Sequence, residues 1–277
     1  MSTPRVRVLM YHGVDRVSAA RDPHGMFVTP RAFRDQVEHL LEAGYVPIDE
    51  ATYLAAGAGT GTGAGAGTPL PRRAVLLTFD DGYVGVGEHA APVLASFGVP
   101  SVLYVPAGLV GGSSDWLPAR HRHPLMGASE LREVAADGMA IGAHGFDHAD
   151  LTTLGAADLH RHVGAARTEL ERVVGRPVRS YAFPYGTHDA RVRAAVRAAG
   201  YDGAFAVHDA AGPFATGRVD VNATDTLRSF RIKLHRHYPR ARRATERFPL
   251  LRRAAHDLVG RAPREELSAP EATGGGR

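Results

Sequence analysis

Short apolar runs alternate along this chain with segments whose apolar residues recur at helical spacing. The apolar runs predict seven strands, over 6–11, 74–79, 101–105, 139–143, 180–183, 203–207 and 219–221. Strands that alternate with helices usually pair in a mostly parallel sheet. The pattern therefore predicts an α/β fold, a distorted or incomplete (β/α) barrel of the TIM type with about seven strands.

Capping residues mark where the intervening helices begin and end. Thr29 followed by Pro30 predicts the start of a helix, and Gly44 predicts its end. Further helices are predicted after Asp49, up to Phe97, from a cap at Ser129 to about Asp137, over 156–174 and over 189–199. Residues 57–68 contain only glycine, alanine and threonine, so they are predicted to form a flexible loop inside one domain.

The character of the sequence changes after residue 235, where the barrel domain (1–235) is predicted to end. Residues 236–277 hold 10 arginines and 5 acidic residues, whereas the rest of the chain is nearly neutral. We expect a basic helical extension over 236–261 and a disordered tail over 262–277. Apolar residues of 250–259 share one helical face, so this helix either packs on the barrel or rests on anionic lipid.

Composition excludes several classes of protein. With 44% hydrophobic and 22% charged residues, the chain is globular rather than disordered. No apolar stretch approaches the ~20 residues of a membrane helix, and 6–11 is too short for the core of a secretory signal. We therefore expect a cytoplasmic protein, with peripheral contact to the inner face of the membrane if the basic helix binds lipid. The net charge of +4 comes with no nucleic-acid-binding module, so no nucleic-acid partner is expected.

Polar residues directly follow four of the predicted strands, where a barrel of this type places its active site. They are His12 after the first strand, Asp80 and Asp81 after the second, His144 after the fourth with His148 beyond it, and Pro184-Tyr185 after the fifth. Each of them alone is more often a turn or core residue. Their joint placement at strand ends favours a catalytic site.

Adjacent carboxylates repel each other unless positive charge lies beside them, and a bound metal ion supplies it. Because the chain has no cysteine, a metal site must use histidine and carboxylate. With Asp81, His144 and His148 as ligands, Zn²⁺ or another divalent metal keeps an open position for water, as catalytic sites do. Asp80 is then free to take a proton from the attacking water.

Three segments resemble the first three motifs of the polysaccharide deacetylases, the NodB-homology carbohydrate esterases. They are Thr78-Phe79-Asp80-Asp81-Gly82, His144-Gly145-Phe146-Asp147-His148 and Phe183-Pro184-Tyr185-Gly186, and the resemblance covers 6–234. It implies a distorted barrel with Asp80 as general base and with Asp81, His144 and His148 as metal ligands. The opening segment 9–13 and the third motif are similar to a subgroup that includes poly-N-acetylglucosamine deacetylases.

The same resemblance assigns two further roles. The backbone N–H of Tyr185 donates to the oxyanion, a role that acyl transfer requires of some donor. The histidine of the opening segment, His12, protonates the departing amine, and His208 is the alternative because it also follows a predicted strand.

The sequence departs from the family pattern at three places. Gly145 stands where the family often has serine or threonine, which removes a supporting hydrogen bond and predicts weaker metal binding. Ala182 stands where many members have an arginine that orients the catalytic aspartate, and Arg218 is the candidate to replace it. The usual Leu-x-His motif near the C-terminus is absent, because 234–237 has the wrong spacing.

The sequence thus predicts a metal-dependent hydrolase that removes acetyl from an N-acetylated sugar or glycan of the N-acetylglucosamine type, either soluble or lipid-linked. Two alternatives stay open. One is hydrolysis of another non-peptide C–N bond in a small amide or cyclic imide. The other is a non-catalytic carbohydrate-binding protein with the same barrel fold, although an inactive barrel has no need to hold two aspartates side by side.

Overall fold

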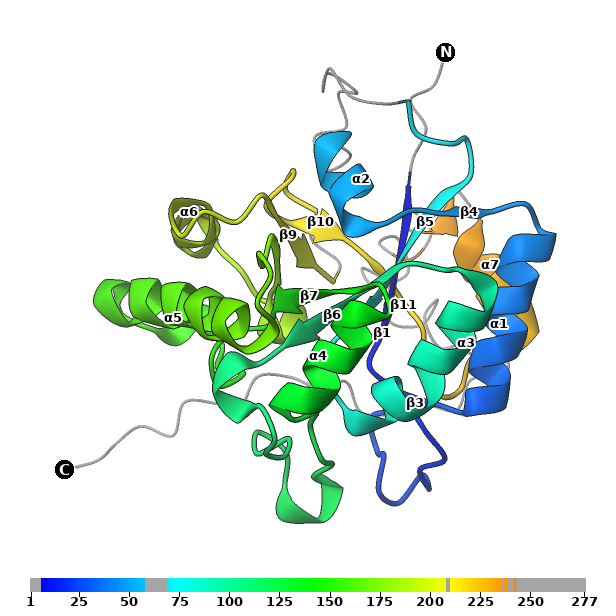
Figure 1. Ribbon diagram of the computed structural model, residues 1–277, viewed down its shortest axis with the longest axis horizontal. Coiled ribbons are helices and arrows are strands. Elements are labelled where there is room, and N and C mark those ends of the chain that lie inside the picture. The colour runs from blue at the N-terminus through cyan, green and yellow to red at the C-terminus, as the bar shows by residue number, and fades with distance from the viewer. Residues whose placement is uncertain (1–5, 58–68, 208–209, 236, 239–241, 243–277) are drawn as a thin grey trace.

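A parallel sheet, nearly closed into a barrel, forms the centre of the computed structural model, which describes residues 6–57, 69–207, 210–235, 237–238 and 242 (Figure 1). The strand order is β10-β9-β8-β7-β6-β5-β1-β11. Because β10 and β11 are separated only by Arg218, they act as one strand that changes partner at this residue. The predicted α/β barrel with about seven strands is confirmed.

Helices surround the sheet on its outer side (Figure 1). The strands are β1 (Arg7–Tyr11), β2 (Gly13–Val14), β3 (Phe27–Val28), β4 (Val46–Pro47), β5 (Ala74–Phe79), β6 (Ser101–Val105), β7 (Met139–Ala143), β8 (Ser180–Ala182), β9 (Gly203–Ala206), β10 (Thr216–Gly217) and β11 (Val219–Asp220). The helices are α1 (Pro30–Glu42), α2 (Glu50–Ala55), α3 (Ala91–Phe97), α4 (Ala128–Ala136), α5 (Ala156–Val174), α6 (Ala190–Ala198) and α7 (Leu227–Leu234).

One predicted helix cap was wrong, and one helix was not predicted. Ser129 does not cap α4, because the helix begins at Ala128 and the Glu130 side chain accepts the backbone N–H of Gly127 at 2.7 Å. The helix α7 was not predicted; Thr226 caps it by accepting the Ser229 N–H at 3.2 Å. The caps expected at Thr29 and Asp49 are confirmed.

Alternation along the strands separates a barrel interior from an outer core. In β5, Val75, Leu77 and Phe79 pack against the surrounding helices, while Ala74 and Leu76 belong to the inner cluster. Successive side chains of a strand point to opposite faces, so Thr78 continues the inner face and Asp80 follows it. The sequence of β5 thus directs the first aspartate into the mouth of the barrel.

Helix α2 lies at the end of the barrel where the strands begin, opposite the strand ends predicted to carry the site (Figure 1). Its Glu50 is only 5% exposed and accepts a short hydrogen bond from Ser180, the first residue of β8. The Ser180 hydroxyl is also hydrogen-bonded to the Tyr104 hydroxyl at 2.8 Å. Burial raises the pKa of Glu50 from 4.5 to about 7.

Replacing Glu50 with glutamine is expected to change how stability depends on pH. A carboxyl whose pKa is raised on folding stabilises the protein fully below pH 4.5, and this contribution is lost as pH rises through about 7. A shift of this size corresponds to about 3 kcal/mol. Between pH 5 and pH 8, Glu50→Gln should therefore gain stability relative to the natural protein, measured by urea unfolding. A constant difference across that range, as expected for the exposed control Glu133→Gln, would contradict it.

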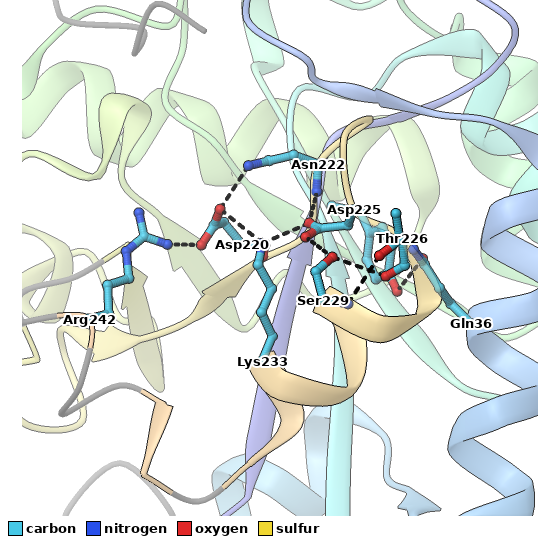
Figure 2. Close-up of polar contacts among 9 residues, drawn as sticks. Gln36, Asp220, Asn222, Asp225, Thr226, Ser229, Lys233 and Arg242 are labelled. Atoms are coloured by element: carbon cyan, nitrogen blue, oxygen red, sulfur yellow. Dashed lines mark hydrogen bonds and ion pairs between the residues drawn. The ribbon is translucent and has the colours of Figure 1, made fainter. Parts of the chain in front are cut away.

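A buried ionic network anchors α7 to the last strand (Figure 2). Lys233 is 2% exposed, and its amino group donates to Asp225 at 2.7 Å and to the backbone oxygen of Asp220 at 2.5 Å. Asp220 also accepts from Asn222 at 2.8 Å and pairs with Arg242, a residue of the basic extension. These contacts hold the chain after β11 against the barrel.

No helix among the described residues is long and apolar enough to cross a membrane. The loop at 57–68, apart from Gly57, the tail at 262–277 and most of the extension lie outside the described residues. The domain boundaries at 235 and 261 therefore stay predictions.

Candidate active site

The two aspartates after β5 take different positions because the backbone turns between them. Asp80 continues the inward alternation of the strand, whereas Asp81 adopts a left-handed backbone with φ 74°. Both are 2% exposed. The turn lets two neighbouring carboxylates face different partners at the same barrel mouth.

Asp80 is held by Arg218, the residue at the seam between β10 and β11. The guanidinium donates from Nη1 and Nη2 to the two carboxylate oxygens, each at 2.7 Å, which is the bidentate arrangement that aligns a carboxylate best. Arg218 also donates to the Thr78 hydroxyl at 3.2 Å and to the backbone oxygen of Ala206 at 3.2 Å. The cation missing at Ala182 is thus supplied by Arg218.

Asp81, His144 and His148 meet on the other side of the mouth. Their ligand atoms lie within 4.8 Å of one another, and all three residues are buried. Oδ1 of Asp81 is 3.4 Å from Nε2 of His144 and 3.2 Å from Nε2 of His148. Nδ1 of His144 lies 2.8 Å from the backbone oxygen of Ala182, which fixes the ring so that Nε2 faces Asp81.

This group fits a divalent cation. Oδ1 of Asp81 is buried and has no well-formed hydrogen bond, a state that costs free energy unless something else binds the oxygen. Ligands that bind one tetrahedral ion at ~2.0–2.1 Å lie about 3.4 Å apart. The separations of 3.2 and 3.4 Å to the two imidazoles match that spacing. One carboxylate and two imidazoles are also a donor set that zinc accepts.

Electrostatics keep both aspartates ionised. Burial raises the pKa of Asp81, but the facing imidazoles of His144 and His148 outweigh it and hold that pKa well below its ordinary value. Burial also raises the pKa of Asp80, and the Arg218 charge outweighs it, so this pKa too lies below its ordinary value. Burial lowers the pKa of His148, whereas at His144 the negative charge of Asp80 outweighs burial and raises it.

Backbone strain is concentrated at this site. Among the described residues, the non-glycine residues with positive φ are Asp81 at 74°, His148 at 61° and Tyr185 at 58°. Such conformations cost roughly 1–3 kcal/mol each and persist only where the surroundings enforce them. All three were predicted as site residues from the sequence, and the strain is an independent sign that the geometry serves function.

Aromatic side chains enclose His148. The indole of Trp116 stacks on its ring at 4.1 Å with an interplanar angle of 11°, and Tyr185 approaches edge-on at 4.7 Å. Burial, with the charge of Asp81, raises the pKa of the Tyr185 hydroxyl to about 12, so it stays neutral. Trp116 was not among the predicted site residues, although it is the only tryptophan of the sequence and lies in a loop rich in glycine, serine and proline.

Of the two candidates for the proton donor, the structure describes His12 but not His208. His12 follows β1 and is close enough for its charge to lower the pKa values of Asp80 and Asp81. Its Nδ1 atom is buried and has no hydrogen-bond partner. His208 lies outside the described residues.

Gly145, where the family often has a hydroxyl residue, has φ 79°. A Cβ atom there would lie 3.3 Å from the Tyr181 hydroxyl and 3.4 Å from Pro184. A side chain at this position would therefore be both strained and crowded, which favours glycine next to His144 in this chain.

Comparison with known proteins places the chain in a family. The family model described as polysaccharide deacetylase matches residues 67–204. The Bacillus subtilis protein YxkH, whose name assigns it to the polysaccharide deacetylases, is 22% identical over 199 residues, which are 71% of this chain and 62% of that protein. The poly-beta-1,6-N-acetyl-D-glucosamine N-deacetylase of Escherichia coli K12 is 37% identical over 100 residues, 36% of this chain and 13% of that enzyme.

A solved structure shows the same fold. The Streptococcus pyogenes deacetylase PplD, in complex with acetate, superposes with a TM-score of 0.70 at 17% identity, covering 83% of this chain and 98% of that one. This chain thus spans 62% and 13% of the two curated relatives, and nearly all of the solved domain. With the motifs, the barrel and the matched segment in agreement, the chain belongs to the polysaccharide deacetylase family.

Proposed function

We propose that this protein hydrolyses the acetamide of an N-acetylated sugar or glycan and releases acetate and a free amine. The observation that carries the proposal is the pairing of two differently held aspartates at one strand end. Asp80 is tied to Arg218 at 2.7 Å, while Asp81 faces two histidines. Hydrolysis of an amide needs a base and an electrophile side by side, and this arrangement provides positions for both.

The substrate class rests on the relatives. One of them is named for N-deacetylation of poly-beta-1,6-N-acetyl-D-glucosamine, and the segment it shares covers 36% of this chain. We therefore propose a substrate of the N-acetylglucosamine type and a Zn²⁺ ion held by Asp81, His144 and His148. When bound, the ion lowers the pKa of a water molecule and polarises the acetyl carbonyl.

The protein's own residues move the protons. Asp80, kept ionised by Arg218, accepts a proton from the attacking water on a carboxylate oxygen. As the new C–O bond forms, the carbonyl oxygen becomes an oxyanion, and the backbone N–H of Tyr185 donates to it. The C–N bond then breaks while His12 donates a proton to the amine nitrogen, which leaves acetate and the free amine.

Acetate release from N-acetylglucosamine oligomers tests the proposal directly. The purified protein is assayed after chelation and again with added Zn²⁺, beside a panel of small amides and cyclic imides. Release of acetate only from the acetylated sugars supports the proposal. Turnover of the amides or imides alone would replace the substrate class, and binding of sugar without any turnover would favour the carbohydrate-binding alternative.

Replacing His12 with alanine should lower kcat by about 10²–10³-fold, because the amine then leaves without a positioned proton donor. Metal binding should be unchanged, since His12 is not among the three ligand residues. The measurement pairs steady-state kinetics with metal content of the purified variant.

A matched control is His24→Ala, which removes a histidine from the long loop between β2 and β3. Turnover of His12→Ala within threefold of the natural protein would remove His12 from the mechanism. His208 would then be the next residue to replace.

We further propose that the basic extension contacts an anionic membrane surface, where a lipid-linked substrate would be reached. The support is the charge of residues 236–277, which hold 10 arginines and 5 acidic residues. Binding to vesicles of phosphatidylglycerol and phosphatidylcholine should exceed binding to pure phosphatidylcholine. It should fall when Arg252 and Arg253 are both changed to glutamine. Equal binding to both vesicles would overturn this part of the proposal.

A further inference from the structure

A line of polar side chains crosses the apolar interior of the barrel, from the end where the strands begin to the active site. It begins at Glu50 on α2 and passes through Ser180 on β8 and Tyr104 on β6. It then reaches Arg218 and Asp80. The proposed mechanism uses only the last two of these residues. Burying the others costs free energy, so their presence calls for a reason.

The contact between Tyr104 and Arg218 joins the two halves of this line. The guanidinium carbon of Arg218 lies 5.6 Å from the centre of the Tyr104 ring, within the range of a cation–π interaction. The other described partners of the guanidinium are oxygens of Asp80, Thr78 and Ala206. The ring therefore adds an apolar contact to the polar ones that hold the buried cation.

The Tyr104 ring is itself held from both sides. Its hydroxyl is hydrogen-bonded to Ser180 at 2.8 Å, and Ser180 is bonded in turn to Glu50. Gly142, on the neighbouring strand β7, makes room for the ring, because a Cβ atom there would lie 2.4 Å from a ring carbon. Tyr104 is 0% exposed. These contacts restrict the movement of the ring.

We propose that Tyr104 is a positioning residue for the Arg218–Asp80 pair, and that Ser180 and Glu50 fix its ring from the end of the barrel where the strands begin. In this arrangement α2, at the opposite end of the barrel from the active site, contributes to the alignment of Asp80, the proposed base. The effect on catalysis rests on the proposed function, but the contact itself does not.

Kinetics test the effect on the reaction. Tyr104→Leu removes the ring, so kcat for deacetylation should fall about 10-fold, while KM and metal content stay within about twofold. Tyr104→Phe keeps the ring but loses the hydroxyl bond to Ser180, so kcat should recover only in part, to about threefold below that of the natural protein. Because Tyr104→Phe also keeps the packing of the ring, the control for packing is the removal of a second buried ring.

The matched control is Phe205→Leu. Phe205 lies in the same inner cluster, is 0% exposed and packs against Tyr104 at 5.7 Å. Because its replacement also removes one buried ring from the barrel interior, a purely structural role predicts equal losses for both variants. Equal loss of kcat in Phe205→Leu and Tyr104→Leu would overturn the proposal.

Nuclear magnetic resonance tests the contact without any substrate. In protein labelled with ¹⁵N-arginine, the guanidinium signals of Arg218, assigned by their loss in Arg218→Lys, should show an upfield ring-current shift. The shift should persist in Phe205→Leu and vanish in Tyr104→Leu. Its absence from the natural protein would overturn the proposal even if the Tyr104 and Phe205 variants do not fold. If the shift is present but no acetylated sugar is hydrolysed, the proposed function fails while the contact stands.

Discussion

Asp80→Asn is expected to lower kcat for deacetylation by about 10³-fold, because asparagine cannot accept the proton of the attacking water. The neighbouring Asp81 is not available to replace it, since its carboxylate faces the two histidines at 3.2 and 3.4 Å. The variant should keep its metal, because Asp80 is not among the three ligand residues. Acetate release and metal content are measured on the same preparation.

The replacement also leaves Arg218 without a full negative partner in a buried site. Removing one member of a buried pair typically costs about 3–5 kcal/mol, although the asparagine oxygen still accepts one of the two hydrogen bonds. Urea unfolding must therefore accompany the kinetics. Asp137→Asn, at the exposed end of α4, is the control for loss of a carboxylate. If folded, metal-loaded Asp80→Asn still turned over at a tenth of the natural rate or faster, the assignment of the base would be wrong.

The part of the site that follows strands was accessible from the sequence. Apolar runs located β1, β5, β7 and β8, and the residues after them came together because parallel strands end at one mouth. The alternation of β5 also explains why Asp80 points inward. Local pattern was sufficient here, since each side chain's direction is set by its own strand.

Contacts that depend on closure of the barrel were harder to predict. Arg218 is separated from Asp80 by 138 residues, and the pair forms only because β11 returns beside β1. The sequence marked Arg218 as a candidate cation, but no local pattern gives its bidentate geometry. Trp116 reaches His148 from a loop whose path no periodicity encodes.

Buried charge accounts for the other omissions. The helix α7 was not predicted because its buried face carries Lys233. Apolar residues at helical spacing are the signal of a helix that packs on a core, and a charged residue interrupts that signal. In the structure Asp220 and Asp225 neutralise that charge. Glu50 is also a charged residue whose burial was not predicted. No local pattern indicates its burial, because its partner Ser180 is 130 residues away. Lys233 holds α7 against β11, and Glu50 begins the separate line of contacts that leads to Arg218.

Removal of the metal is expected to abolish acetate release, because the carbonyl is then no longer polarised by a Lewis acid and the attacking water is no longer activated. Added Zn²⁺ should restore the activity and should also raise the unfolding temperature, since a ligand of the folded state stabilises it by about 2.7 kcal/mol at 100 times its dissociation constant.

Zn²⁺ affinity should weaken as pH falls, because His144 must lose its proton before it can bind the metal. The pKa of this histidine is raised, since the negative charge of Asp80 outweighs the effect of burial. Asp81→Asn, which replaces the charged ligand by a neutral one of equal size, should bind Zn²⁺ at least 100-fold more weakly by calorimetry. Its activity should not return at Zn²⁺ concentrations that restore the natural protein. Full activity in thoroughly chelated protein, with no metal by elemental analysis, would show that the buried carboxylate and its two histidines serve another purpose.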